Sequence, residues 1–183
     1  LDTGRFQHGI AVERERKLTG WPGDDSAIAA DDLTLRADAP VLEGVSLRVA
    51  SGEALIATGR DRKVRRALAF TIAGRISAGD GRLRVAGHLL PGRDAWVRAH
   101  VGCVLVDDAD AALLDLAEAL RGRSSVVVID GIDGFTGAQR DQASAMLRDA
   151  AAGRTLTVFA TATDGDTARA ILADAGWRSA ALL

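Results

Sequence analysis

The sequence predicts a single α/β domain with a largely parallel sheet, and three observations support that prediction. The chain has 183 residues, which suits one domain of ordinary size. Its content of 48% hydrophobic and 26% charged residues is typical of a globular protein. Short apolar runs alternate with segments of helical spacing, and this alternation produces parallel strands with helices on both faces of a sheet.

The first half of the chain predicts alternating strands beside one buried strand. Residues 28–35 and 45–49 alternate between apolar and polar side chains, which is typical of half-buried antiparallel strands. Residues 54–58 form a short apolar run of buried-strand character. Residues 65–76 have helical spacing, and residues 82–85 follow a glycine turn as a further strand. We therefore expect an antiparallel part at one side of the parallel sheet.

The second half predicts three buried strands, each followed by a helix. The strands are expected at residues 101–106, 125–129 and 156–160, and the helices at residues 111–120, 138–152 and 166–175. The strand that ends on Asp130 is the clearest, because its four preceding residues are all β-branched.

Residues 1–26 are predicted to be a leader or linker, followed by one domain at residues 27–183. The segment combines a mixed charge run at residues 13–17 with a turn-rich stretch at residues 20–25. Such a composition favours a mobile arm. The alternative is a docking segment in which Trp21 is the aromatic anchor.

Composition argues against several classes of function. A net charge of −2 gives no electrostatic case for nucleic acid or an anionic membrane. The chain has no apolar run of about 18 residues that would cross a bilayer, and no signal-peptide pattern, so we expect a cytoplasmic protein. Cys103 is the only cysteine and the three histidines share no metal-ligand spacing, which excludes an internal disulfide and a zinc cluster.

We expect Cys103 to be a buried core thiol. Trp96 and Trp177 are expected to cover the core edge, with a partner surface as the alternative.

A series of motifs follows one another in the order found in one family of ATPases. The matching segments are residues 41–53 (VLEGVSLRVASGE), the strand leading to Gly59, the spacing from Gly59 to Gly74, and residues 79–88 (GDGRLRVAGH), 98–104 (RAHVGCV), 125–130 (SVVVID) and 153–164 (GRTLTVFATATD). Together they resemble the ATP-binding domain of ABC transporters over about residues 28–175. The resemblance implies a P-loop NTPase-like three-layer sandwich with a mostly parallel sheet and an antiparallel β part.

The phosphate loop departs from the family pattern at each functional position. The family has G-x-x-x-x-G-K-[ST], and residues 59–66 read GRDRKVRR. Val64 occupies a glycine position, where a β-branched residue is disfavoured. Arg65 replaces the lysine that reaches the phosphates, and Arg66 replaces the hydroxyl that holds Mg²⁺. The resemblance thus implies a vestigial nucleotide site, with no catalytic residue and no cofactor. Its residues are Gly59, Arg62, Lys63, Arg65, Arg66 and Asp130.

Other family positions are altered as well. Val106 stands in place of the Q-loop glutamine, Gly131 in place of the catalytic glutamate and Thr163 in place of the switch histidine. The adenine-stacking aromatic expected near Arg36 is absent. Asp130 is retained and is a weak metal candidate, although we expect it to have a structural use.

The signature motif LSGGQ is absent, and the segment between Val106 and Asp130 has room for one helix and no helical subdomain. The resemblance therefore implies a non-catalytic module that acts as a scaffold or regulatory subunit. Its partner would be a membrane protein or another ABC-type subunit, which places it in the cytoplasm or peripherally at the inner face of the membrane. The alternative is an atypical ATPase, completed by a partner chain, that still binds ATP and Mg²⁺.

Acidic and basic side chains are expected to face each other at the carboxyl end of the sheet. The acidic set is Asp107, Asp108, Asp110, Asp130 and Asp133, and the basic set is Arg60, Arg62, Lys63, Arg65 and Arg66. Our hypothesis is that the two sets neutralise each other and that arginines fill the vacated nucleotide site. The alternatives are a solvated loop without defined pairing and weak capture of phosphate or nucleic acid.

Overall fold

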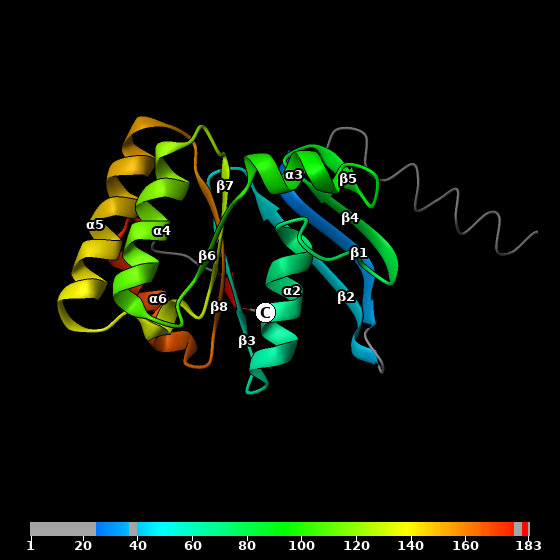
Figure 1. The fold of residues 1–183 in the computed structure, drawn as a ribbon, viewed down its shortest axis with the longest axis horizontal. Coiled ribbons are helices and arrows are strands. Elements are labelled where there is room, and N and C mark those ends of the chain that lie inside the picture. The colour runs from blue at the N-terminus through cyan, green and yellow to red at the C-terminus, as the bar shows by residue number, and fades with distance from the viewer. Residues whose placement is uncertain (1–24, 37–39, 178–180, 183) are drawn as a thin grey trace, which may run out of the picture.

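The computed structural model describes residues 25–36, 40–177 and 181–182, and these form three layers with a second sheet alongside (Figure 1). Helices α4, α5 and α6 cover one face of the parallel sheet. Helix α2 packs on the other face, between the parallel sheet and an antiparallel sheet. The leader predicted at residues 1–26 lies almost wholly outside the described residues.

The parallel sheet has five strands in the order β6-β7-β8-β3-β9. The strands are β3 (Ala54–Thr58), β6 (Gly102–Leu105), β7 (Val126–Asp130), β8 (Thr157–Ala162) and β9 (Ala181–Leu182). Every residue of β7 and β8 is buried. A central parallel strand is covered on both faces, which explains the continuous apolar runs in the sequence. Strand β6 forms one edge of the sheet.

Three of the four main helices begin where the sequence supplies a capping carboxylate. The four are α2 (Arg62–Ile72), α4 (Ala109–Arg121), α5 (Gly137–Gly153) and α6 (Gly165–Asp174), and α5 begins after Thr136 without a side-chain cap. Asp61, Asp108 and Asp164 each accept hydrogen bonds from two backbone amides in the first turn of α2, α4 and α6. The four predicted helices are confirmed. Helix α4 alone joins β6 to β7.

The antiparallel sheet has four strands in the order β2-β1-β4-β5. The strands are β1 (Ser26–Arg36), β2 (Pro40–Ala50), β4 (Asp80–Val85) and β5 (His88–Leu90). Gly81 has φ +86°, and a Cβ there would lie 2.2 Å from the carbonyl oxygen of Asp32, so the close approach of β1 and β4 requires glycine. The predicted α/β class with an antiparallel part is confirmed.

Four short elements escaped prediction: α3 (Asp94–His100), β5, β9 and the 3-10 helix η1 (Ile132–Gly134). Each is too short for its periodicity to stand out. Helix α2 begins three residues before the predicted start, because Asp61 caps it. It ends at Ile72, before the predicted Ile76, because Gly74 follows with φ +66°. None of the helices in the described part of the chain has the length and apolar character that a membrane crossing requires.

Candidate functional site

The loop that follows β3 leads directly into α2, and its aspartate satisfies the first amides of that helix. The Oδ1 atom of Asp61 accepts hydrogen bonds from the backbone N–H groups of Lys63 at 2.8 Å and Val64 at 3.4 Å. Asp61 has φ −80° and ψ 106°, the extended geometry of an N-cap residue. The positive end of the α2 dipole is thus neutralised by a carboxylate of the same chain.

The backbone of residues 59–66 also differs from an anion-binding nest. Such a nest turns successive N–H groups inward by alternating right-handed and left-handed residues. None of residues 59–66 has a positive φ. The valine and arginine side chains that replace glycine in this segment are compatible with that conformation.

Asp130, at the end of β7, has a donor on each carboxylate oxygen. Thr161 Oγ1 donates to Oδ1 at 2.6 Å, and Arg66 Nε donates to Oδ2 at 2.7 Å. The Asp130 side chain is only 3% exposed and the Arg66 side chain 26% exposed. A nearly buried carboxylate is stable only when it is paired, so Arg66 and Thr161 together hold Asp130 as part of the fold.

Asp107 links two arginines of α2 across the same end of the sheet. It accepts hydrogen bonds from Arg62 and from Arg66. The hydrogen bond from Arg66 holds the pKa of Asp107 below its usual value. The bonds to Asp107 and Asp130 raise the pKa of Arg66. The ion-pair hypothesis is therefore confirmed for two carboxylates and two arginines.

Arg65 has a different partner. The residue is 8% exposed, its side chain donates to the carbonyl oxygen of Gly59, and its Nε has no hydrogen-bond partner among the described residues. An apolar cavity of about 540 Å³ lies beside this contact, lined in part by Leu42, Val45 and Leu68. Arg65 thus closes the loop onto its own helix instead of reaching across to the acidic set.

The remaining members of the two sets do not meet. Asp108 caps α4, and Asp110 accepts a hydrogen bond from Gln139 at 2.9 Å. Asp133 accepts from two backbone amides at the start of α6. Arg60 and Lys63 have no side-chain partner among the described residues and line an open cavity of about 740 Å³. The prediction that both full sets neutralise each other is wrong for these residues, because backbone amides satisfy Asp108 and Asp133 and the side chain of Gln139 satisfies Asp110.

The altered family positions have structural roles. Gly131 has φ +78°, and its N–H donates to Thr161, both to the carbonyl oxygen and to Oγ1, at 3.0 Å. The backbone N–H of Thr163 donates to Asp133 at 2.9 Å. Val106 donates its N–H to the carbonyl oxygen of Asp130 at 2.9 Å and continues the pairing of β6 with β7. The adenine-stacking position near Arg36 lies at the boundary of the described residues.

Cys103 is not the buried core thiol that the sequence predicts. It is half-buried and lines a cavity at the edge of β6, where burial raises the pKa of its thiol. Cys103 faces the α2 side of β6, whereas the neighbouring Val104 points to the opposite face and is fully buried. Trp96 and Trp177 pack against the edges of the two core clusters, as predicted, and Trp177 Nε1 also donates to the carbonyl oxygen of Gly52 at 2.8 Å.

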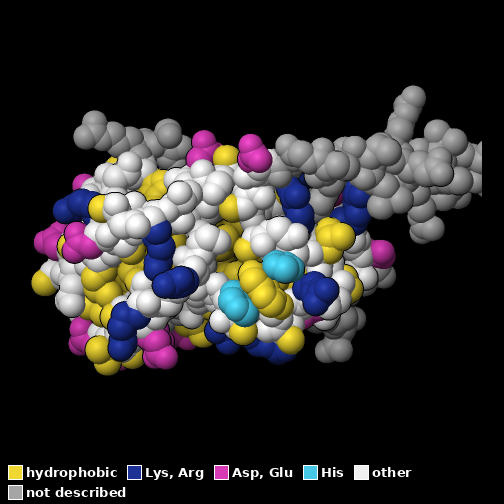
Figure 2. All heavy atoms as spheres, turned by 90° about the horizontal axis from the view of Figure 1, so that it is seen from above, with side chains coloured by type: hydrophobic (Ala, Val, Ile, Leu, Met, Phe, Trp, Pro, Cys, Tyr) yellow, Lys and Arg dark blue, Asp and Glu magenta, His cyan; other side chains and the backbone are white. Residues whose placement is uncertain are grey.

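Two histidines that lie apart in the sequence meet at Trp96. The ring centroid of Trp96 is 3.7 Å from that of His88 and 4.1 Å from that of His100. Figure 2 shows the histidines on either side of apolar surface on this face. No group of three or more histidine, cysteine or carboxylate side chains within the described ranges could hold a metal ion.

Sequence reasoning missed two residues of this region, Asp61 and Thr161. Asp61 directly precedes α2, and aspartate is one of the residue types favoured at an N-cap, but it lies four residues before the predicted segment of helical spacing. Thr161 has no sequence signal, because only the parallel pairing of Asp130 with Thr161 in β7 and β8 brings its hydroxyl to the carboxylate.

Comparisons with known proteins agree with the architecture. No protein-family model and no curated protein sequence matches the chain. Among solved structures, cbiO1 from Clostridium perfringens, described as part of the ABC transporter complex cbiONQ, matches with a TM-score of 0.61 and 11% identity, over 80% of this chain and 82% of that one. MJ0796, described as a bacterial ABC transporter cassette, matches with a TM-score of 0.60 and 11% identity, over 78% of this chain and 90% of that one. The chain therefore has the fold of an ABC ATPase domain.

Proposed function

We propose that this protein is a non-catalytic ABC-ATPase-like module that acts as a scaffold or regulatory subunit of a transport-associated complex. The observation that supports this most directly is the bonding of the Asp61 carboxylate to the first amides of α2. The N-terminus of a helix after a P-loop is the place where phosphates accept hydrogen bonds. Here an internal anion holds two of those amides, and its charge repels another anion.

The residues at the end of β7 do not fit Mg²⁺–ATP. A magnesium ion needs oxygen ligands with free lone pairs and usually a hydroxyl from the loop. Each oxygen of Asp130 already accepts one hydrogen bond, which leaves it a single lone pair, and the Arg66 cation stands where the hydroxyl would be. A guanidinium only donates and has a positive charge, so it excludes the ion from this position. No hydrolytic step follows from this geometry.

A role in a complex is supported by the retention of the fold without its chemistry. The structural relative cbiO1 is described as part of an ABC transporter complex. By analogy, the partner of this chain is a membrane protein or another ABC-type subunit, and the location is the cytoplasm or the inner face of the cell membrane. Neither a bound cofactor nor a resident metal is part of this proposal.

Thermal unfolding of the full chain with increasing Mg²⁺–ATP tests the proposal. We expect no change in Tm up to millimolar nucleotide, since a ligand that does not bind the native state does not stabilise it. An active ABC cassette measured in parallel is the positive control. A saturable rise in Tm would instead support an atypical ATPase that a partner chain completes.

A variant tests the physical cause. Asp61→Gly combined with Arg66→Thr removes the internal anion and frees one oxygen of Asp130. We expect this variant to gain a nucleotide-dependent rise in Tm that the wild type lacks. The matched control is Asp141→Gly with Arg98→Thr, at exposed positions of α5 and α3, which should gain none.

A further inference from the structure

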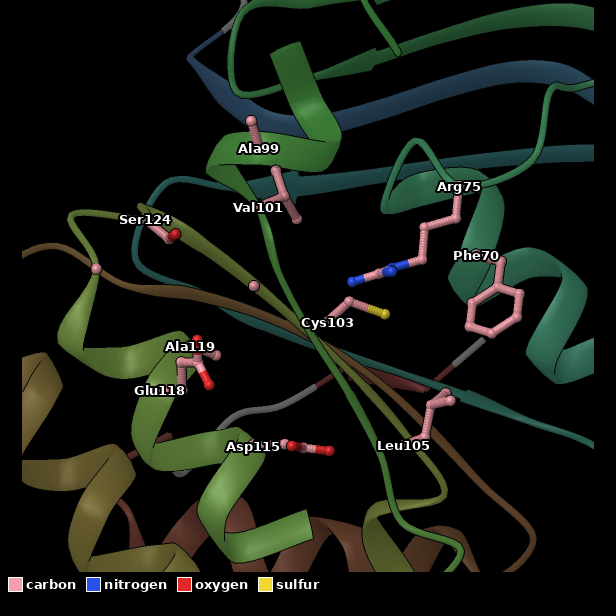
Figure 3. A pocket seen from close by; sticks show the side chains of 12 residues that line it. Phe70, Arg75, Ala99, Val101, Cys103, Leu105, Asp115, Glu118, Ala119 and Ser124 are labelled. Atoms are coloured by element: carbon pink, nitrogen blue, oxygen red, sulfur yellow. The ribbon is translucent and has the colours of Figure 1, made fainter. Parts of the chain in front are cut away.

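The edge of β6 is an open groove between two helices. Among the residues that the structure describes, β6 has only β7 as a neighbour in the parallel sheet. A cavity of about 490 Å³ lies along its free side (Figure 3). Phe70 of α2 and the following Arg75 line one wall, and Asp115 and Glu118 of α4 line the other. The groove is therefore a slot with the strand at its base and a helix on either side.

The backbone of β6 presents hydrogen-bonding groups to this slot. The N–H of Val106 donates to the carbonyl oxygen of Asp130 on β7. Peptide groups along a strand point to its two sides in alternation, so those of Val104 also face β7. The N–H and C=O groups of Cys103 and Leu105 then point away from the sheet. Both residues line the slot, which makes these groups available to another strand.

The side chains of the slot add a charge pattern. Arg75 reaches toward Cys103 from the α2 side, and Asp115 and Glu118 lie on the α4 side (Figure 3). Asp115 and Glu118 have no hydrogen-bond or ion-pair partner among the residues that the structure describes. Phe70 and Leu105 provide apolar surface on the α2 side. The two walls therefore differ, one acidic and the other apolar with a single cation.

We propose that β6 binds an extended segment of a partner protein as an additional strand. The segment pairs with the outward groups of Cys103 and Leu105. Its side chains alternate, with basic ones directed at the carboxylates of α4 and apolar ones at the wall beside Phe70. This inference rests on the proposed scaffold function and specifies how the partner is held.

The charges favour a different protein over a second copy of this chain. Two β6 edges that pair antiparallel around a two-fold axis keep the same face of each sheet on the same side. Helix α4 of one copy would then lie beside α4 of the other, and Asp115 and Glu118 would face their own counterparts. Like charges at an interface oppose association, whereas a basic segment satisfies them.

A labelled peptide of alternating lysine and valine tests the charge pattern against the full chain by fluorescence anisotropy. We expect saturable binding that weakens about tenfold in the double variant Asp115→Lys, Glu118→Lys. The control double variant Asp141→Lys, Asp149→Lys makes the same change of charge on exposed positions of α5 and should bind as the wild type does. Equal weakening in both variants, or equal binding of a peptide with glutamate in place of lysine, would overturn the proposal.

Amide hydrogen exchange measured by NMR tests the strand pairing itself. We expect the peptide to slow exchange at Cys103 and Leu105, while Gly102 and Val104 keep the protection that β7 already gives them. Binding without this alternation would show a helical or non-specific contact and would refute strand addition. Protection of Cys103 and Leu105 in the free protein would do the same, because a second copy or residues of this chain would then occupy the edge. A failure here leaves the nucleotide titration unaffected, so the two proposals are tested separately.

Discussion

At the scale of single residues, the carboxylates at the carboxyl end of the parallel sheet share a small set of hydrogen-bond donors. Asp130 has two donors from two different elements, and Asp107 has two arginines of one helix. Arg66 belongs to both groups, so it is the residue on which the arrangement depends. Hydrogen bonds that involve a charged group are stronger than neutral ones, and the loss of one leaves its partner unsatisfied.

The first prediction concerns Arg66. Replacement by alanine leaves a nearly buried carboxylate with Thr161 as its remaining donor, so Arg66→Ala should lower the free energy of unfolding by about 2–3 kcal/mol. Urea denaturation measures the loss. Adding Asp130→Asn to Arg66→Ala should restore part of it, because the amide has no charge to be buried. If Arg66→Ala is as stable as the wild type, the hydrogen bond from Arg66 to Asp130 does not contribute to the stability of the fold.

The second prediction concerns acid stability. The pKa of Asp107 is lower in the folded state than in the unfolded chain, chiefly because Arg66 donates to it. The folded state therefore binds fewer protons, and the contribution of Asp107 is present above the unfolded pKa and is lost as pH falls below about 4. Between pH 6 and pH 3, roughly the range of this titration, the wild type should lose more stability than Asp107→Asn. Parallel pH profiles of the two proteins would contradict the expected linkage.

At the scale of elements, the sequence predicted most of the fold, because buried parallel strands and capped helices have strong local patterns. Strand β7 is an example, since its β-branched run and final aspartate mark it clearly. The two ends of α2 were harder to predict from the sequence. Asp61 sets the start, and Gly74, which packs closely against α3, sets the end. The charge pairs at the site were predicted in outline from topology, but their partners depended on which carboxylates the backbone had already satisfied.

The third prediction tests the end of α2. A Cβ at Gly74 would lie 2.9 Å from the carbonyl oxygen of Asp94 and 3.1 Å from Val97. Gly87 also has a positive φ, of +82°, but nothing lies within 4 Å of its Cβ position. Gly74→Ala and Gly87→Ala should each lose about 1–2 kcal/mol from backbone strain. Gly74→Ala should lose more, because it also pushes α2 away from α3. Equal losses of stability in thermal denaturation would show that α3 moves away from the new Cβ at position 74 without an energetic cost.

At the scale of the whole molecule, two core clusters share the strands of one sheet. Val158 of β8 belongs to the cluster beneath α4 to α6, and the adjacent Phe159 belongs to the cluster beneath α2 and the antiparallel sheet. Since successive side chains of a strand face opposite ways, neither cluster can lose this strand without exposing the other. The two sides of the molecule are therefore expected to unfold together.

The fourth prediction measures this cooperativity. A variant that keeps Trp96 as its only tryptophan reports on the cluster beside the antiparallel sheet, and one that keeps Trp177 reports on the other. Each variant has phenylalanine at the two remaining tryptophan positions. Within each variant, fluorescence and far-ultraviolet circular dichroism should give the same midpoint in urea. Fluorescence midpoints that depart from the circular dichroism in opposite directions would show that the clusters unfold separately.

The capping of α2 by Asp61 also affects how this loop responds to dissolved anions. A carboxylate tethered two residues from its donors has an effective concentration far above that of any free anion in a cell. Phosphate or sulfate must therefore displace the Asp61 carboxylate, which loses almost no translational entropy on binding because it belongs to the same chain. For that reason the conformation of the loop between β3 and α2 should not change with the concentration of phosphate or sulfate in solution.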